Sequence, residues 1–481
     1  KWQGEVAALQ SLFYIAAGAP HKAVLTGERA LQLIPRTSYY VRSVALLHVI
    51  FGMFMAGEFA FADTLLEDAA ADPWIARDLA ITRSLQARHF IQLAAADLTG
   101  MRATFPKLLQ MATARGFKTT AAWAHYFWGC TGYLQNYLSE AEEHFSAVLD
   151  LADFANALTY THSAIGLALT RQAQGAPHDA TAVVASAQAH LRHQRLDQML
   201  ELLNAFAAEL AVRQGRAGEG MRWLAKDSRD LTVDAIPMFY VPGLAPVKVL
   251  LANPTEENLE AAEMWLARVS TIAVQTHNVQ IGIQVQALQA VLSTVQGKNA
   301  QALAELSRAL AMAEGGGLLR VFADLSQQLM PLLEQLQPAR NIGSFLWQVR
   351  SAAANELETG RKITLTAALD VLPSSPSGHA EPSTRMPADL TSTAQTSRQT
   401  ALMQPEGPWL EQRDLRHVLT YREMDVLRLL NQRLTNKEIA RQLGISTETV
   451  RQHTVKLFRK LNVENRRQAI VVARAMGYFD D

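Results

Sequence analysis

The amino-acid sequence predicts an all-α fold. It is rich in Ala, Leu and Gln, and the strict alternation of apolar and polar residues that marks a half-buried strand is hard to find. A helix–turn–helix pattern recurs every 39 or 40 residues through the body of the chain, and helix-capping signals of another kind follow near its end. Because 481 residues are too many for one hydrophobic core, we expect two to four structural units.

The body repeat is defined by its turns. A small residue usually follows each turn by five positions and allows close helix packing, but Met101 breaks that pattern. One hairpin cannot bury its apolar face alone, so the hairpins must stack into a superhelix over residues 1–335. The period exceeds the roughly 34 residues of tetratricopeptide (TPR) repeats, which predicts a TPR-like solenoid with longer helices. Most turn positions carry Gly or Asn, which tolerate the left-handed conformation that ends a helix, and Ala96 is the exception. The turn positions are Gly18, Gly57, Ala96, Asn136, Gly175 and Gly215, with fainter copies at Asn253 and Gly297.

A solenoid offers a concave surface to peptides, proteins or small ligands. Residues 235–243 interrupt the helical pattern with two prolines, which fits a ligand loop or a longer inter-repeat loop without a ligand. An aromatic-rich stretch fits either the concave surface or the core between repeats, and it contains Trp123, Tyr126, Phe127, Trp128, Tyr133 and Tyr137.

Residues that carry chemistry are sparse. His190 and His193 share one side of a helix, but without an evident third ligand we interpret them as surface histidines, not a metal site. Cys130 is the only cysteine, which excludes a disulfide within the chain, favours a reducing, cytoplasmic compartment and predicts a buried apolar role. We find no nucleotide loop, nucleophile elbow or paired carboxylates, so we predict no enzymatic activity and no cofactor in this chain.

The chain also lacks sequence signals for a membrane. The longest apolar stretch, around Ala45–Ala56, is too short to span a bilayer and contains His48. The first residues carry an early Glu and do not have the layout of a signal peptide. We therefore expect no membrane partner.

The composition changes after the repeats. Residues 336–371 predict a terminal helical segment, and residues 372–412 are rich in Pro, Ser and Thr, which predicts a flexible linker. The formal net charge of zero hides an asymmetry. From His417 to Asp481 there are 12 Lys and Arg against 7 Asp and Glu, so that segment carries +5 and the rest carries −5. A basic tail on an acidic body is typical of a nucleic-acid-binding module.

Four short helices are predicted for residues 413–481. Thr420 with Glu423, and Thr435 with Glu438, form capping boxes that open the first two helices. Gly444 makes a tight turn after the second helix. Ser446 caps the third helix, which ends at Leu461, and the fourth helix spans residues 465–476. The expected inward residues are Val426, Leu427, Leu430, Leu434, Ile439, Ala440, Leu443, Ala469, Ile470, Val472 and Ala473.

The third helix buries one edge and presents another. At about 100° per residue, Val450, Leu457 and Leu461 fall within about 40° of one another. The opposite edge is polar and cationic, which suits a helix in the DNA major groove, and it carries Gln452, Val455 and Arg459, flanked by Arg451 and Lys456.

The segment from Leu419 to about Ala473, with its ordered caps, turn, NKEIA and TVRQH elements, resembles the LuxR-type helix-turn-helix. It departs from the family pattern at Arg433, where Gly is usual. The resemblance implies a partly buried structural role for His453. It also implies base-facing roles for Arg451, Gln452 and Val455, and phosphate-contacting roles for Asn436, Lys437, Thr447, Thr449 and Lys456.

Residues 2–35 and 317–336 resemble the helical-repeat region of the large ATP-binding, MalT-like regulators of the same family. Such regulators carry an N-terminal signal-transduction ATPase. This chain has no G-x-x-x-x-G-K-[ST] motif, so that part either precedes Lys1 or has been lost. The missing initial Met favours the first alternative.

The leading hypothesis is therefore a bacterial transcriptional regulator, with the sign of regulation open between activator and repressor. Its solenoid senses a small-molecule effector or a protein partner, and its tail binds double-stranded promoter DNA. The resemblance further implies RNA polymerase as a partner and oligomerisation on DNA, for which the exposed face of Asn465–Met476 is one candidate surface. The alternative is a TPR-like interaction scaffold whose tail binds protein instead of DNA.

Overall fold

The computed structural model divides into two compact units, Lys1–Ala367 (unit 1) and Ala368–Asp481 (unit 2). It describes residues 2–59, 62, 64–65, 78–227, 238–337, 343–370, 426–427, 429–432, 434–443, 446–460, 463, 466 and 469–470. Within these ranges, the side chains of residues 78–81, 227, 362–370, 448, 456 and 459–460 are not described. The described residues form helices, turns and loops without a strand, and the all-α prediction is confirmed.

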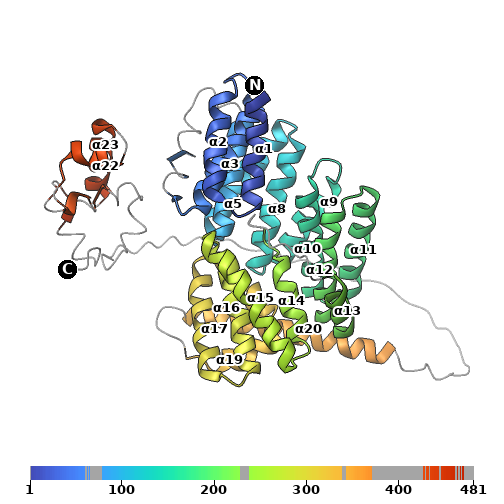
Figure 1. Ribbon diagram of the computed structural model, residues 1–481. Coiled ribbons are helices and arrows are strands. Elements are labelled where there is room, and N and C mark those ends of the chain that lie inside the picture. The colour runs from blue at the N-terminus through green and yellow to red at the C-terminus, as the bar shows by residue number, and fades with distance from the viewer. Residues whose placement is uncertain are drawn as a thin grey trace, which may run out of the picture. The chain divides into compact units, whose positions relative to one another are not determined.

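Unit 1 is a superhelix of antiparallel helical hairpins (Figure 1). The first helices of the successive hairpins are α1 (Trp2–Ala16), α3 (Tyr39–Met55), α5 (Asp78–Ala94), α8 (Lys118–Leu134), α10 (Ala157–Ala173), α12 (Asp197–Arg213), α14 (Ala245–Leu251) and α16 (Val279–Val295). The second helices are α2 (Pro20–Leu33), α6 (Leu98–Arg102) with α7 (Phe105–Ala114), α9 (Leu138–Asp150), α11 (Pro177–His193), α13 (Ala217–Asp227), α15 (Glu256–Gln275) and α17 (Asn299–Ala313). The remaining elements of this unit are η2 (Pro242–Leu244), η3 (Glu314–Gly316), α18 (Arg320–Ala323), α19 (Ser326–Gln335) and α20 (Gly343–Asp370).

The turns of the hairpins lie where the sequence predicts them. Seven of the eight predicted turn residues have positive φ, including Ala96 at 59° and Asn136 at 67°. At each of the seven, the next backbone N–H donates to the carbonyl five residues earlier at 2.7 to 2.9 Å, as from Tyr137 to Gly132. This is the Schellman motif, which satisfies carbonyls at a helix end. Asn253 is the exception, because its φ is not positive.

The sequence analysis missed a second set of left-handed turns, between consecutive hairpins. They lie at Gly116, Arg195, His277 and Gly317 and have the same five-residue hydrogen bond at 2.8 to 3.2 Å. Glycine, arginine and histidine all occupy this position, so no single residue type marked it in the sequence.

The small residue five positions after the turn is buried at the contact between the two helices of a hairpin. Ala23, Ala141, Ala180 and Ala302 are fully buried there. Met101 takes the equivalent place and is also fully buried. In that hairpin alone among the described ones, the second helix is divided, into α6 and α7.

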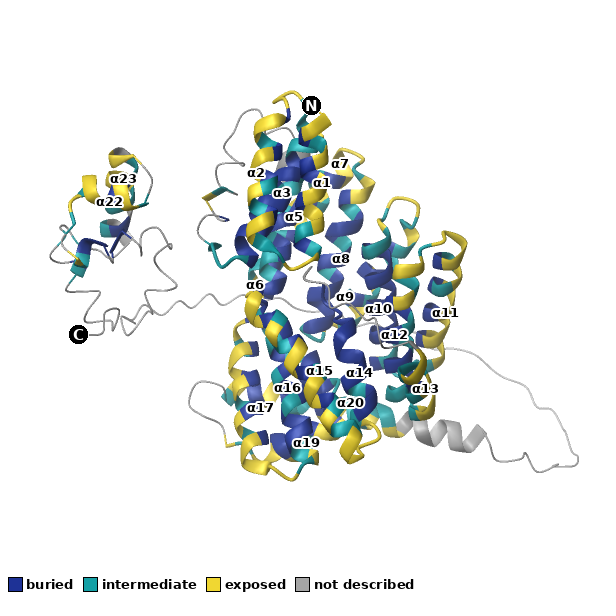
Figure 2. Ribbon diagram, viewed as in Figure 1, coloured by how far each residue is buried: buried dark blue, intermediate teal, exposed yellow. Residues whose placement is uncertain are grey.

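First and second helices differ in burial (Figure 2). The second helices bury a single stripe with helical spacing, such as Ala262, Leu266, Val269 and Ala273 of α15. Inner first helices such as α8 and α10 are buried around much of their circumference, because they pack against their own partner and against neighbouring hairpins, and α10 buries thirteen of its seventeen residues. The terminal helix α1 buries a single stripe.

The superhelix brings its early hairpins against its late ones. The Phe59 ring contacts the His277 ring at a centroid distance of 5.3 Å, and Gln135 donates to the Gly316 carbonyl at 2.9 Å. The periodicity predicts stacking of neighbours only, and these contacts span about 180 to 220 residues of chain. They make unit 1 a closed body instead of an open array.

Residues 238–241 form a loop between hairpins, as one of the two interpretations expected, but this loop is buried. The earlier part of the 235–243 segment lies outside the described residues, and Met238 to Val241 are buried in the core. The Phe239 N–H donates to the Tyr126 hydroxyl at 3.1 Å, and Gln280 donates to the Phe239 carbonyl at 3.1 Å. The segment is therefore a buried loop between α8 and α16, and its burial was not predicted.

Unit 2 contains two described helices, α22 (Asn436–Leu443) and α23 (Thr447–Lys460), which pack on each other. Its small core joins them to helical residues on either side in the sequence. The core residues are Val426, Leu427, Leu429, Leu430, Ile439, Ala440, Val450, Leu457 and Ala469.

Candidate nucleic-acid interface

Both described helices of unit 2 begin at side-chain caps. The Thr435 N–H donates to Glu438 Oε2 at 2.7 Å, and the Glu438 N–H donates back to Thr435 Oγ1 at 3.4 Å. The Thr449 N–H donates to Ser446 Oγ at 3.0 Å. These bonds form the predicted capping box of α22 and the predicted cap of α23. The backbone hydrogen bond from Thr435 lowers the pKa of the Glu438 carboxyl.

The inward edges of these helices are also as expected. Ile439, Val450 and Leu457 are fully buried, and Leu434 and Leu443 pack against them. The predicted first helix, with its Thr420 and Glu423, lies largely outside the described residues, as do Arg433, Gly444, Leu461, Val472 and Ala473. Of its stripe, Val426, Leu427 and Leu430 are buried.

The sequence analysis gave Arg466 no role. Its guanidinium donates to the carbonyls of Leu434 at 2.9 Å and Leu430 at 2.6 Å. It thus satisfies carbonyls that a helix end leaves without partners and fixes the first helix beside α22. Arg466 lies more than 30 residues along the chain from the carbonyls it contacts, so no local sequence pattern marks this contact.

The three base-facing candidates lie on one exposed edge of α23. Arg451 and Gln452 are exposed, and Val455 is 58% exposed although it is a large apolar residue. His453, between them, is half-buried. An apolar side chain left in water beside polar ones is the arrangement that reads a base edge and a thymine methyl.

The phosphate-contacting candidates flank that edge. Lys437 and Thr447 are exposed, and Asn436 and Thr449 are half-buried at the N-terminal ends of their helices. The Thr449 hydroxyl is shared with Ser446 at 2.8 Å, so its backbone is firmly placed. Lys456 belongs to α23, but its side chain lies outside the described residues, as does that of Arg459.

Within unit 1, most of the candidate aromatic residues form core. Tyr126, Phe127 and Tyr133 are buried, Trp123 is 5% exposed, and only Tyr137 is exposed. Trp128 is half-buried and donates to Glu140. The inter-repeat interpretation is therefore correct for this stretch, with Trp123 also reaching a cavity described below.

The histidine and cysteine candidates are structural. The His190 ring packs on Tyr160 at a centroid distance of 4.5 Å, and His193 is exposed. Cys130 is fully buried, and burial raises the pKa of its thiol well above the usual value, which makes it unreactive. The described residues contain no group of three metal-ligating side chains and no helix that is long and apolar enough to cross a membrane.

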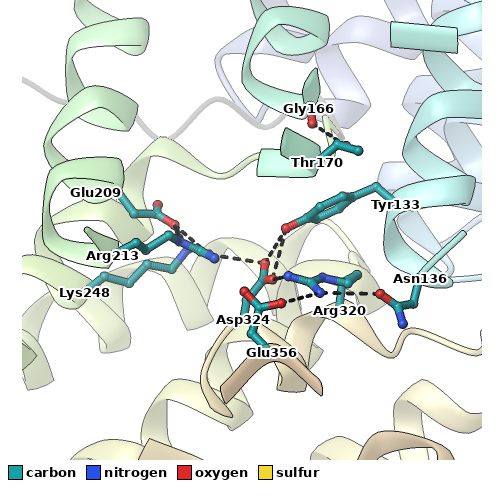
Figure 3. Close-up of polar contacts among 10 residues, drawn as sticks. All are labelled: Tyr133, Asn136, Gly166, Thr170, Glu209, Arg213, Lys248, Arg320, Asp324 and Glu356. Carbon is teal, nitrogen blue, oxygen red and sulfur yellow. Dashed lines mark hydrogen bonds and ion pairs between the residues drawn. The ribbon is translucent and has the colours of Figure 1, made fainter. Parts of the chain in front are cut away.

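A buried charge cluster in unit 1 was not predicted (Figure 3). Asp324 accepts from Tyr133 at 2.8 Å and pairs with Arg213 at 3.2 Å and with Arg320. Arg213 and Lys248 both pair with Glu209, at 3.0 and 2.7 Å. The cluster links α8, α12, α14 and α18, which are up to 191 residues apart in the sequence.

The cluster also holds the last helix of the unit. Arg320 donates to Glu356 of α20 at 2.8 Å, and its side chain is 3% exposed. Three acidic and three basic side chains balance, since Glu209, Asp324 and Glu356 face Arg213, Lys248 and Arg320. Although burial opposes its ionised form, the neighbouring Arg213 and Arg320 lower the pKa of Asp324 to about 2.

Two family models match the chain. That of the MalT-like TPR region matches residues 4–339, and that of the bacterial regulatory proteins of the luxR family matches residues 417–473. These matches confirm both resemblances drawn from the sequence.

Individual relatives match the C-terminal segment. The chain is 48% identical over 63 residues to the spore germination protein GerE of Bacillus subtilis, covering 13% of this chain and 85% of that protein. It is 53% identical over 55 residues to the nitrate/nitrite response regulator protein NarP of Escherichia coli, covering 11% and 26%. It is 41% identical over 64 residues to the HTH-type transcriptional regulator MalT of Vibrio parahaemolyticus, covering 12% and 7%. The chain thus spans about a quarter of the length of NarP in that match.

Proposed function

Because these two family models together span most of the chain, it belongs to the LuxR-family regulators that carry a MalT-like TPR region, and we propose that it controls transcription by binding promoter DNA. In this proposal residues 413–481 bind DNA, residues 1–335 sense the signal, and residues 336–371 and 372–412 connect the two. A single buried cysteine is compatible with a cytoplasmic location.

The observation that carries this proposal is the division of α23 into two edges. One edge is buried through Val450 and Leu457, and the other presents Arg451, Gln452 and Val455. A side-chain cap fixes the N-terminal end of each helix, at Thr435 for α22 and at Ser446 for α23. This is the geometry in which a recognition helix lies in the major groove while the preceding helix crosses the backbone.

The residues divide into two roles. Arg451 and Gln452 donate to base edges, and Val455 packs on a thymine methyl. Asn436, Lys437, Thr447, Thr449 and Lys456 contact phosphates, which position the helix without reading sequence.

The signal enters through unit 1. A small-molecule effector or a protein partner on its surface shifts an equilibrium between a closed form and one that assembles on DNA. Assembly places two or more C-terminal domains on neighbouring sites and raises their effective concentration, with RNA polymerase as a further partner. Light scattering that gives the same mass with and without effector and DNA would exclude the assembly step.

Sequence selection with the full chain tests the role of α23. Selection from a random duplex pool should yield a consensus, and Gln452→Ala or Arg451→Ala should relax it at one or two base pairs, each by about 1–3 kcal/mol of discrimination. The matched control is Lys437→Gln, which should weaken binding to all sequences alike and leave the consensus unchanged.

Two results would overturn the assignment. A consensus that both α23 variants leave intact would remove the base-reading role. Absence of DNA binding at low salt, with a folded C-terminal domain, would favour the interaction scaffold instead.

A further inference from the structure

Unit 1 contains a cavity of about 870 Å³ that neither family match assigns. It lies against the first helices of the N-terminal hairpins. Its walls come from α1, α3, α5 and α8 and from the N-terminal ends of α10 and α12. Cavities of roughly 300–1,000 Å³ hold small molecules, so this one has the size for a single compact ligand.

Most of the wall is apolar. Phe51, Phe90 and Trp123 form an aromatic side of the cavity, and Leu12, Leu47 and Leu158 face it from other helices. The Phe90 ring meets the Trp123 ring edge-on at 5.0 Å, which fixes the orientation of both. A ligand in this space therefore needs an apolar body, and a flat ring would stack on this side.

Basic side chains outnumber acidic ones on the described wall of the cavity. The described lining holds two arginines, Arg83 and Arg195, against one carboxylate, Asp197. His48 also faces the cavity, but burial lowers its pKa to about 4, so its ring is neutral. The described lining thus carries one more basic than acidic side chain.

Arg83 has no carboxylate partner among the described residues. Its Nη1 donates to the Gln86 amide at 2.8 Å, and its guanidinium lies 5.7 Å from the centre of the Tyr40 ring. Its Nε is buried without a hydrogen-bond partner. In the buried cluster of the same unit, by contrast, each arginine has at least one carboxylate partner. A half-buried arginine with only an amide acceptor beside an apolar cavity is a site prepared for an anion.

Arg195 lies across the cavity in a strained conformation. Its φ is 56°, in a turn where glycine serves at Gly116 and Gly317. The turn also precedes α12, whose first residues line the cavity, so the positive end of that helix faces it. Its N-cap residue Leu196 makes no side-chain cap hydrogen bond.

We propose that this cavity binds a small molecule with an aromatic or branched apolar body and a single carboxylate, which pairs with Arg83 and lies near Arg195. The ligand would be the effector of the proposed function, so this inference rests on that function. A cation finds only Asp197 there, and a polar, hydroxyl-rich ligand would leave its groups unpaired against the apolar wall.

The test uses the full chain and three aromatic carboxylates: phenylacetate, indole-3-acetate and 1-naphthaleneacetate. Each is compared with its own amide by isothermal titration calorimetry, because the amide keeps the shape and removes the charge. At least one carboxylate should bind with Kd below 1 mM and at least tenfold more tightly than its amide.

Variants locate the site. Arg83→Gln should remove most of the advantage of the carboxylate over the amide and leave amide binding unchanged. Leu47→Trp should fill the cavity and abolish binding of both, with circular dichroism confirming the fold. Arg308→Gln, an exposed arginine of α17 outside the cavity, is the matched control and should change neither.

Three results would overturn the proposal: no binding by any of the three acids up to 1 mM, equal binding of acid and amide, or unchanged preference in Arg83→Gln. A gel shift of the same protein with random duplex DNA separates failure of the cavity assignment from failure of the proposed function. If DNA is bound but the acids are not, only the cavity assignment fails. If the acids bind with the expected preference but DNA is not bound, the proposed function fails and the cavity stands as a ligand site.

Discussion

Units 1 and 2 are both built of short helices, but they start those helices differently. In unit 2 both described helix starts use a hydroxyl cap, from Thr435 and from Ser446. In unit 1 side-chain caps occur at Asp97, Asn156, Thr255 and Asn278, and most other described helices, such as α2, α3, α8, α9, α11, α12 and α17, begin without one.

The difference follows from how each helix is packed. A typical first helix of unit 1 has 17 residues and is covered by its own partner and by neighbouring hairpins, so tertiary burial stabilises it. In unit 2, α22 has 8 residues and α23 must leave one edge exposed. With less burial available, a cap of about 1 kcal/mol is a larger share of the stability. The exposed edge that the proposed function needs is thus compensated by local capping.

The largest effect should come from the buried charge cluster of unit 1. Asp324→Asn removes the carboxylate that pairs with Arg213 and Arg320 and leaves both guanidinium groups buried without it. We expect the free energy of unfolding of unit 1 to fall by about 3–5 kcal/mol. Unfolding in urea followed by circular dichroism would measure this change.

Glu219→Gln is the matched control in the same unit. Its ion pair with Arg216 is exposed on both sides, so its loss should cost about 0–1 kcal/mol. If the two variants lost equal stability, burial would not be what distinguishes the contacts of unit 1.

A smaller effect should appear with pH. Burial lowers the pKa of His162 to about 3, so the folded protein keeps this ring neutral while the unfolded chain protonates it near pH 6.5. Above pH 6.5 the buried His162 ring therefore costs no stability. Below pH 6.5 the free energy of unfolding falls by about 1.4 kcal/mol for each pH unit. His162→Leu should remove that part of the slope between pH 6.5 and 5 in the unfolding of unit 1.

The exposed His193 supplies the comparison. His193→Leu should leave the slope of stability against pH unchanged, because the fold does not bury that ring. An unchanged slope in His162→Leu would mean that His162 does not carry the acid sensitivity of the core.

The smallest expected effect comes from removing an N-cap serine, and the same substitution can be made in each unit. Ser446→Ala removes the hydroxyl cap of α23 and should lower the stability of unit 2 by about 1 kcal/mol. Ser38 occupies the same N-cap position of α3, but its side chain makes no cap hydrogen bond, so Ser38→Ala should be close to neutral. Thermal unfolding of the two variants would check both, and an equal loss would contradict the role given to caps in unit 2.

Much of the architecture could be predicted because it is encoded locally. Glycine and asparagine tolerate the positive φ of the hairpin turns and so marked most of them, and Ala96 was placed by the period alone. The cap of α22 was readable because Thr435 and Glu438, three residues apart, form a capping box, and the cap of α23 because serine is a favoured N-cap residue. The exposed edge of α23 followed from helical spacing.

Contacts between distant segments could not be predicted. Tyr133 and Asp324, Arg320 and Glu356, and Phe59 and His277 meet only because the superhelix closes on itself, and no local pattern marks them. Prolines and a broken period predicted the loop at residues 238–241, but they did not predict that its side chains lie in the core. The cavity beside Arg83 is likewise assembled from six helices and could not be located from a single sequence stretch.

The most direct test of the account measures how DNA binding by the full chain depends on salt. Binding to a random 30-base-pair duplex should fall linearly on logarithmic axes as salt rises, and Lys437→Gln should reduce the slope by about 0.9. Arg308→Gln in unit 1 should leave the slope unchanged. Binding that ignores salt, or a slope that Lys437→Gln does not alter, would contradict the claim that α22 and α23 of unit 2 present a DNA-binding edge.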